Sequence, residues 1–490
     1  MEKNFSQKVN QATKWSSITE IAVKLVAPIT NTILARLLMP EVFGVVATLT
    51  IVVSFAEIFT DAGFQKYLVQ HQFTDDSDLD KSTNVAFWTN LGLSVIIWAI
   101  IAAFATPIAN LVGSPGCEIA IIVISAEIPL LAFSSIQMAR YRRDFDFKNL
   151  FYARMASALV PLFVTVPLAI IFRSYWALVY GTIARDILNA VILMARSSWK
   201  PKFMYSWNKL KEMISFSLWT VLENISIWLA NNIDIFIISR VLSDYYLGLY
   251  KTTITTANGY MNLITAATTP VLFSALSRCQ DNDHEFSKVF FKFQRMVAML
   301  VFPLGFGLFV YRELATSILL GSQWAETADF LGMWCLTGAL MVIFSYYNSE
   351  VFRSKGKPKL SVLSQVLHLV ALVPVLIWVA DQGYAVLTSA RATVRLEGVL
   401  ASSLILHFVI KIRIKSVLKN VWPSLVSAAL MAAAGWWLRT LISGVVWELV
   451  TVAFCVLIYA GCMYVIPAGR RQLDEIPLLR KLLHLKELSQ

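Results

Sequence analysis

Apolar stretches of about 20 residues recur along almost the whole chain, from Trp15 to Ile466. A helix of that length crosses the roughly 30 Å hydrocarbon core of a bilayer. Only 15% of the 490 residues are charged, whereas soluble domains usually carry about 25%. The pattern predicts an all-α polytopic membrane protein with about 14 transmembrane helices and no soluble domain between them. The predicted spans are roughly 15–38, 43–64, 83–106, 116–138, 150–172, 174–196, 213–239, 246–273, 290–311, 326–350, 360–380, 384–408, 421–440 and 445–466.

Basic residues concentrate in four of the predicted loops, at 140–148, 200–211, 353–359 and 411–419. All four loops fall on one side of the membrane, so the positive-inside rule predicts that both termini are cytoplasmic. The polar N-terminus also lacks the pattern of a removable signal peptide. Loops that face anionic membrane lipids account for the net charge of +11, and no nucleic acid partner is needed to explain it.

The usual signatures of enzymes and metal sites are missing from the sequence. The five cysteines show no CxxC spacing, which argues against a zinc site or a disulfide framework. The sequence contains neither a GxxxxGK[ST] phosphate loop nor an HExxH motif. We therefore predict no catalytic residues, no cofactor, no metal and no enzymatic activity.

Two segments of the sequence look like copies of each other. "ARLLMPEVFG" ends at Gly44 and "SRVLSDYYLG" ends at Gly248, and the same ungapped offset of 204 residues pairs Trp15 with Trp219 and Arg36 with Arg240. The repeat predicts two pseudo-symmetric six-helix lobes, at 1–204 and 205–415, related by a pseudo-two-fold axis along the membrane normal. Residues 416–490 would then add two C-terminal helices and a tail with leucines and basic residues at the spacing of an interfacial amphipathic helix.

Eight short motifs follow one another along the sequence: "TKWSSI", "LARLLMPEVFG", "FTDAGFQKYLVQ", "FWTNLGLS", "RYRRDFDFKNL", "ISFSLWT", "VLFSALSRCQDN" and "LLGSQWAE". With these motifs the chain from about Trp15 to Lys359 resembles the Wzx-type polysaccharide flippases, in particular the colanic-acid-exporter-like branch of the multidrug/oligosaccharidyl-lipid/polysaccharide transporter superfamily. The adjacent Arg185 and Asp186 depart from the small apolar residues that the family often has in the sixth span.

The resemblance implies a function in the synthesis of surface polysaccharides such as lipopolysaccharide or exopolysaccharide. The protein would move an undecaprenyl-diphosphate-linked oligosaccharide from the cytoplasmic to the periplasmic leaflet of a bacterial inner membrane. Its expected partners are that lipid-linked substrate, the membrane lipids and the polysaccharide polymerase machinery.

Polar and charged side chains inside the predicted spans indicate where such a substrate would bind, because a charge at mid-bilayer costs at least about 2.5 kcal/mol unless it faces water or a partner. An ion pair between Lys24 and Glu20 would equally explain the lysine. The amides could equally serve as hydrogen bonds between helices. The candidate cavity residues in the first, seventh and eighth spans are Lys24, Asn31, Asn224, Asn231, Asn258 and Asn262.

Arg391 and Arg395 form the most distinctive cluster, because they lie one turn apart on the twelfth predicted span. Two guanidinium groups at this spacing repel each other unless an anion lies between them, and their paired donors suit a diphosphate. Neutralisation by Glu397 or Glu127 within the protein is the alternative.

Four titratable residues within the predicted spans are candidates for coupling transport to a proton or sodium gradient. A buried carboxyl group or imidazole can load a proton in one conformation and release it in another. A lone deep histidine can also simply be satisfied by a neighbouring side chain. The candidates are Glu127, Asp234, His368 and Glu397.

Two other functions compete with the flippase. A drug or cation exporter of the same superfamily would need an acidic cavity, and Lys24, Arg391 and Arg395 argue against one. A membrane glycan polymerase would be expected to have a large periplasmic loop, whereas the predicted loops on that side are short.

Overall fold

The computed structural model describes residues 2–61, 64–357 and 359–474. In this part of the chain the regular secondary structure is helical, with no strand. Ten of the described helical segments are long and apolar enough to cross a membrane. Four further long helices, α1, α11, α12 and α18, coincide with the predicted spans 1, 7, 8 and 12. The all-helical class is confirmed, and the total of 14 spans stays a prediction.

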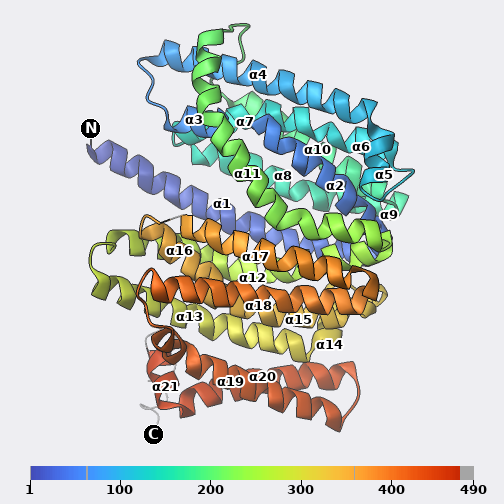
Figure 1. The fold of residues 1–490 in the computed structure, drawn as a ribbon, viewed down its shortest axis with the longest axis vertical. Helices are drawn as coiled ribbons and strands as arrows, with labels where there is room; N and C mark the ends of the chain where they lie inside the picture. Colours follow the sequence, from blue (N-terminus) through green and yellow to red (C-terminus); the bar gives the residue numbers. More distant parts are fainter. Residues whose placement is uncertain (1, 62–63, 358, 475–490) are drawn as a thin grey trace. The chain divides into compact units, whose positions relative to one another are not determined.

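Contacts divide the chain into two compact units, Met1–Thr252 and Thr253–Gln490. In the first unit α1 packs on α8, α4 and α10 pack on α7, and α11 lies along α2 (Figure 1). Its elements are α1 (Glu2–Leu37), α2 (Pro40–Asp61), α3 (Phe64–Gln70), α4 (Asp76–Ala103), α5 (Ala105–Leu111), α6 (Glu118–Ser125), α7 (Glu127–Arg143), α8 (Phe147–Val160), η1 (Pro161–Thr165), α9 (Val166–Phe172), α10 (Tyr175–Arg196), α11 (Trp207–Val241) and the first turns of α12 (Asp244–Arg278).

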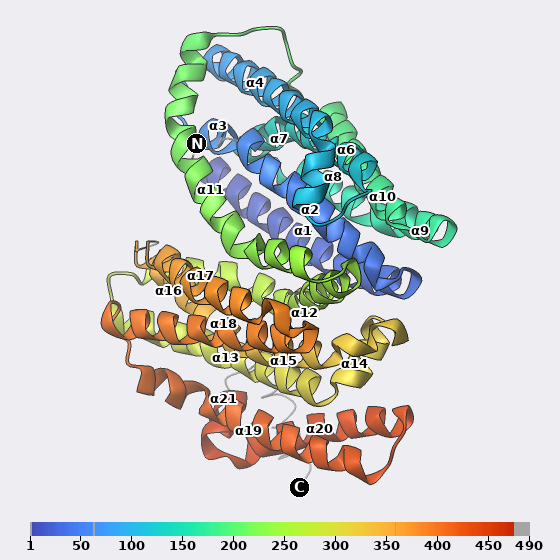
Figure 2. The same ribbon diagram turned by 45° about the vertical axis from the view of Figure 1, so that its right-hand side comes forward.

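In the second unit α13 packs on α15 and α19, and α18 lies between α15 and α17 (Figure 2). Its elements after α12 are α13 (Asp283–Val310), α14 (Arg312–Leu319), η2 (Ser322–Thr327), α15 (Ala328–Met341), η3 (Val342–Tyr346), α16 (Tyr347–Ser354), α17 (Lys359–Val379), η4 (Ala380–Gln382), α18 (Tyr384–Phe408), α19 (Ile414–Leu441), α20 (Val445–Val465) and α21 (Pro467–Asp474).

Polar side chains fix where several of these helices begin. The Asp75 carboxylate accepts a hydrogen bond from the backbone N–H of Asp78 at the start of α4, and Asn282 caps α13 in the same way. Such caps satisfy N–H groups that have no partner within the helix. A π-helical segment interrupts the helix after Val160, where Pro161 cannot donate a backbone hydrogen bond. The irregular turn η1 lies beside α10, which carries the charged pair Arg185 and Asp186.

The helix ends follow the offset of the sequence repeat. The helices α1 and α11 end at Leu37 and Val241, and the next helices begin at Pro40 and Asp244, so both pairs lie 204 residues apart. The lobe boundaries and the superposition of one lobe on the other stay predictions.

Two glycines of the repeat lie where α2 crosses the start of α12. A Cβ atom on Gly44 would collide with the carbonyl oxygen of Asp244, and one on Gly248 would collide with that of Pro40. The same offset relates Gly44 to Gly248 and Pro40 to Asp244. The two contacts are therefore reciprocal, as expected of residues that face each other across a two-fold axis.

Candidate functional site

The first unit contains a polar cavity of about 580 Å³ between α1, α2, α7, α8, η1 and α10. Most of its wall is apolar, as expected within a membrane-embedded helix bundle. Its polar side chains come mainly from α8 and α10, with one amide from α1. They include Asn31, Arg154, Thr182, Arg185, Asp186 and Asn189.

An ion cluster lies at the wall of this cavity. The Arg185 guanidinium donates to a Glu127 carboxylate oxygen on α7 at 2.8 Å and, through Nε, to Asp186 Oδ1 at 2.8 Å. The Arg185 side chain is 39% exposed, whereas those of Glu127 and Asp186 are 13% and 4% exposed. One guanidinium thus pairs with two carboxylates, and it is the most exposed member of the cluster.

The second unit holds the predicted arginine pair in a different environment. Arg391 and Arg395 on α18 are only 7% and 4% exposed. Their Cζ atoms lie 5.0 Å and 3.7 Å from the centre of the Trp334 ring on α15. Arg395 also donates to the Trp334 carbonyl oxygen at 3.2 Å. The tryptophan face attracts both cations through its quadrupole.

The same tryptophan connects the arginine pair to α12. The indole Nε1 of Trp334 donates to Asn258 Oδ1 at 3.0 Å. The predicted cavity residue Asn258 therefore supports the aromatic ring on which the arginines stack. The sequence did not single out Trp334, because its spacing along α15 carries no sign of which side chains face it from α18.

Glu397 does not pair with the arginines on its own helix. Its Oε2 lies 3.4 Å from Nδ1 of His368 on α17. Further along α18, the Ser402 hydroxyl lies 3.0 Å from Ser345 Oγ and 2.9 Å from Ser364 Oγ. Two of the ion-coupling candidates are thus brought together, and Glu127 is joined to Arg185 in the first unit.

The other predicted residues lie apart from these clusters. Asp234 is 3% exposed and accepts a hydrogen bond from the Tyr250 hydroxyl at 2.6 Å. Lys24 is half-buried on α1, and Asn231 and Asn262 are exposed. The side chains of Asn224 and Glu20, and the tail at 475–490, lie outside the described residues.

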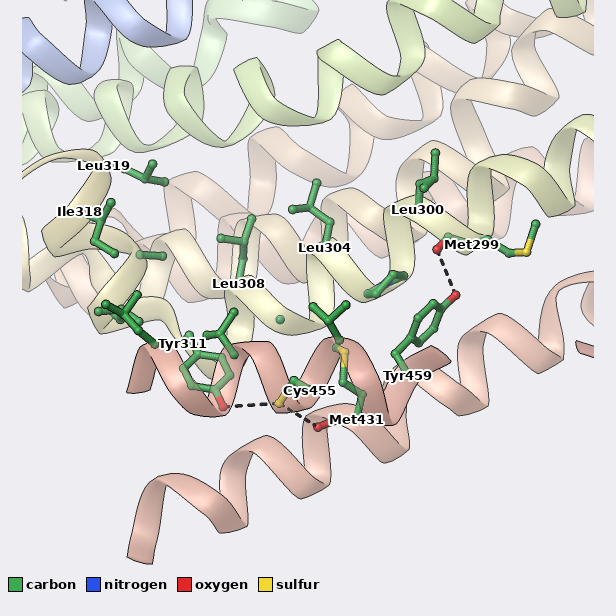
Figure 3. A pocket seen from close by; sticks show the side chains of 17 residues that line it. Met299, Leu300, Leu304, Leu308, Tyr311, Ile318, Leu319, Met431, Cys455 and Tyr459 are labelled. Carbon is green, nitrogen blue, oxygen red and sulfur yellow. Dashed lines mark hydrogen bonds between the residues drawn. The ribbon is translucent and has the colours of Figure 1, made fainter. Parts of the chain in front are cut away.

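An apolar groove of about 600 Å³ is formed by α13, α14, α19 and α20 (Figure 3). Its two phenols are turned to polar partners in the wall: the Tyr311 hydroxyl lies 3.4 Å from Cys455 Sγ, and the Tyr459 hydroxyl donates to the Met299 carbonyl oxygen at 3.0 Å. The groove thus presents little to a polar ligand. In the described part of the chain, no cluster of three or more His, Cys, Asp or Glu side chains is suited to hold a metal ion.

Comparison with known proteins identifies similar proteins of polysaccharide biosynthesis. The chain is 25% identical to the succinoglycan biosynthesis transport protein ExoT of Rhizobium meliloti over 327 residues, which are 67% of this chain and 65% of ExoT. It is 20% identical to the lipopolysaccharide biosynthesis protein WzxC of Escherichia coli over 377 residues, 76% of this chain and 75% of WzxC.

The fold is similar to that of the lipid II flippase MurJ in an inward closed conformation. The TM-score is 0.72 at 14% identity, and the match covers 92% of this chain and 98% of MurJ. A family model described as "Polysaccharide biosynthesis protein" matches residues 33–329, which is more than half of the sequence. The chain is therefore a multi-pass membrane protein that belongs to the polysaccharide biosynthesis protein family.

Proposed function

We propose that this protein is a flippase that moves an undecaprenyl-diphosphate-linked oligosaccharide from the cytoplasmic to the periplasmic leaflet of a bacterial inner membrane by alternating access. The likeness to transport proteins of polysaccharide biosynthesis and to the fold of a lipid II flippase supports transport rather than enzymatic chemistry. The orientation, with both termini in the cytoplasm, is part of the proposal.

The observation that carries the proposal is the set of arginines inside the helix bundle. Arg154 and Arg185 line the polar cavity of the first unit. Arg391 and Arg395 lie within the second unit. A cation in the hydrocarbon region is costly unless it has a function or a partner. Guanidinium groups present planar pairs of donors that match the oxygens of a diphosphate.

The two arginine clusters suggest successive roles. Arg185 is partly exposed to its cavity, so it can meet a diphosphate in the conformation described here. Arg391 and Arg395 are covered, so a ligand reaches them only when the Trp334 contact opens. In an alternating-access cycle, the buried pair would become available in a second conformation.

The carboxylates beside Arg185 are the strongest candidates for ion coupling. Glu127 and Asp186 share one guanidinium, so the three groups carry a net charge of −1 when both carboxyl groups are ionised. A proton or a sodium ion bound there would cancel this charge within the bilayer. His368 and Glu397 form the second candidate, and Asp234 is held by Tyr250.

The test is flipping by the purified protein in vesicles. A lipid-linked oligosaccharide from the cell in which the protein occurs is placed in one leaflet. Movement of its glycan to the other leaflet is measured by whether an added glycosidase can cleave the glycan. We expect protein-dependent movement of the diphosphate-linked glycan. Export of cationic drugs without any movement of the glycan lipid would overturn the proposal in favour of a drug exporter.

A further inference from the structure

A second apolar recess, of about 710 Å³, lies in the first unit between α2, α4, α5 and α11. Its wall is formed by aliphatic and aromatic side chains, among them Phe55, Ile100, Leu111, Leu229 and Phe236. Several of these are open to the outside: Phe55 is 41% exposed, Ile100 is 52% exposed and Leu229 is 37% exposed. A convex apolar surface only borders the surrounding lipid, whereas a recess can enclose a single hydrocarbon chain.

Aromatic rings pack against one another in the wall of the recess. The rings of Phe55 and Trp228 lie 4.9 Å apart, and those of Phe55 and Phe59 lie 5.3 Å apart. The Trp228 indole donates to Ser54 Oγ at 3.0 Å, which ties α11 to α2 and satisfies the polar atom of the tryptophan. The wall therefore keeps its shape without presenting hydrogen-bonding groups to an occupant.

A cation lies at one end of the recess. Arg240 is exposed, and its Nε donates to the Leu111 carbonyl oxygen at 3.0 Å. Its Cζ lies 4.9 Å from the centre of the Phe236 ring. Leu111 and Phe236 both line the recess, so the guanidinium is fixed at its rim. An apolar recess with a cation at its end is complementary to a lipid with an anionic head group.

We propose that this recess binds the polyprenyl chain of the carried lipid, with its diphosphate at Arg240. The inference rests on the proposed function, which supplies the polyprenyl diphosphate. In the proposed orientation Arg240 lies at the periplasmic end of α11. The recess is then the place where the lipid is held after its glycan has reached the outer leaflet. This site is separate from the polar cavity beside Arg185, which shares none of its lining residues and is lined mainly by α1, α8 and α10.

The test is photocrosslinking in nanodiscs of phosphatidylethanolamine and phosphatidylglycerol. The probe is undecaprenyl diphosphate without a glycan, carrying a diazirine in its chain. We expect adducts on α2, α4 and α11 around Phe55, Ile100 and Leu229. Adducts confined to other helices would overturn the inference. It would also be overturned if phosphatidylglycerol suppressed the adducts as strongly as unlabelled undecaprenyl diphosphate does, because the recess would then be a general lipid site.

Two kinds of substitution test the recess and its cation. Leu229→Trp fills the recess, and Arg240→Gln removes the charge at its end. Each substitution should weaken probe binding roughly tenfold, which is equivalent to losing about two buried methylene groups. Leu300→Trp, in the apolar groove of the second unit, is the matched control and should leave binding unchanged. Ile100→Trp fills the recess from α4 instead of α11. If one of the two tryptophan variants does not fold, the other still tests the recess. Unchanged probe binding by the folded tryptophan variants contradicts the inference.

Flipping of the complete glycan lipid is measured separately on the unaltered protein. Flipping without adducts in the recess removes the inference and leaves the proposed function standing. Adducts in the recess without flipping leave a polyprenyl diphosphate site and remove the proposed function.

Discussion

The two charged clusters hold their arginines in opposite ways. In the first unit Arg185 is bound by the carboxylates of Glu127 and Asp186 and reaches a cavity. In the second unit Arg395 contacts the face of Trp334, the carbonyl oxygen of that residue and the Thr337 hydroxyl.

Carboxylates cancel the charge of a guanidinium, whereas an aromatic face, a carbonyl and a hydroxyl stabilise the cation without cancelling it. The comparison shows that an arginine inside a membrane protein can be kept neutralised and accessible, or charged and covered. We expect the covered pair to contribute more to the binding of an anion, and the neutralised arginine more to the stability of the fold.

The largest expected effect follows removal of the covered pair. The double variant Arg391→Ala with Arg395→Ala should lower glycan export at least about 100-fold, because each truncated charged contact in a buried site is worth about 2–5 kcal/mol. Export is measured in cells that lack the natural gene, with the amount of inserted protein followed on blots. Arg278→Ala, at the exposed end of α12, is the control and should export normally. Normal export by the double variant would show that the pair is structural.

Removal of Arg185 should act mainly on stability. Arg185→Gln leaves Glu127 and Asp186 without their shared cation. Breaking a buried ion pair lowers the free energy of unfolding by about 3–5 kcal/mol. Because Arg185 is partly exposed, we expect a loss at the lower end of this range. Thermal unfolding in detergent should show a clear drop in Tm, and adding Glu127→Gln with Asp186→Asn should restore most of it.

Arg196→Gln provides the control on the same helix. Arg196 is exposed, donates to the neutral side chain of Asn149 and lies 4.7 Å from the centre of the Tyr152 ring, so its loss should cost at most about 1 kcal/mol. A triple variant as unstable as Arg185→Gln alone would mean that the carboxylates are not the cause, and the contrast between the two clusters would fail.

The aromatic contact of the second cluster should have a smaller effect. Trp334→Phe keeps a ring face for the arginines and removes the hydrogen bond to Asn258, so it should cost about 1 kcal/mol. Trp334→Leu should cost about 1–2 kcal/mol more, since it also removes the ring face. Both are measured by thermal unfolding beside Asn258→Ala. Equal losses for the phenylalanine and leucine variants would argue against a role of the ring face.

The sequence predicted the fold from patterns that are local to each helix. Apolar runs indicated the helices, and the repeat gave the positions at which α1 and α11 end. The arginine pair was predictable because both residues lie on one helix at a spacing of one turn. Trp334 was missed because its partners belong to a helix some 60 residues later in the chain.

The polar cavity was harder to predict for the same reason. Asn31 was selected, but Arg154 was not, and Arg185 with Asp186 stood out only as a departure from a family pattern. Their grouping depends on how α1, α7, α8 and α10 pack, which the spacing along any one helix does not contain. The amides Asn231 and Asn262 were selected as cavity residues and lie exposed in the structure, and their part in substrate binding stays a prediction.

The central claim is that the cationic clusters carry an anionic head group across the membrane, and the most direct measurement is flipping under a clamped membrane potential. Purified protein in vesicles is supplied with the diphosphate-linked glycan, and potassium with valinomycin sets the potential at equal pH and equal sodium on both sides. Each charge that crosses the full potential gains roughly 2.3 kcal/mol per 100 mV.

We expect flipping to accelerate when the receiving side is positive and to slow when the potential is reversed, because one cycle moves net negative charge outward. A rate that stays the same at zero and at reversed potential would contradict this electrical account of transport.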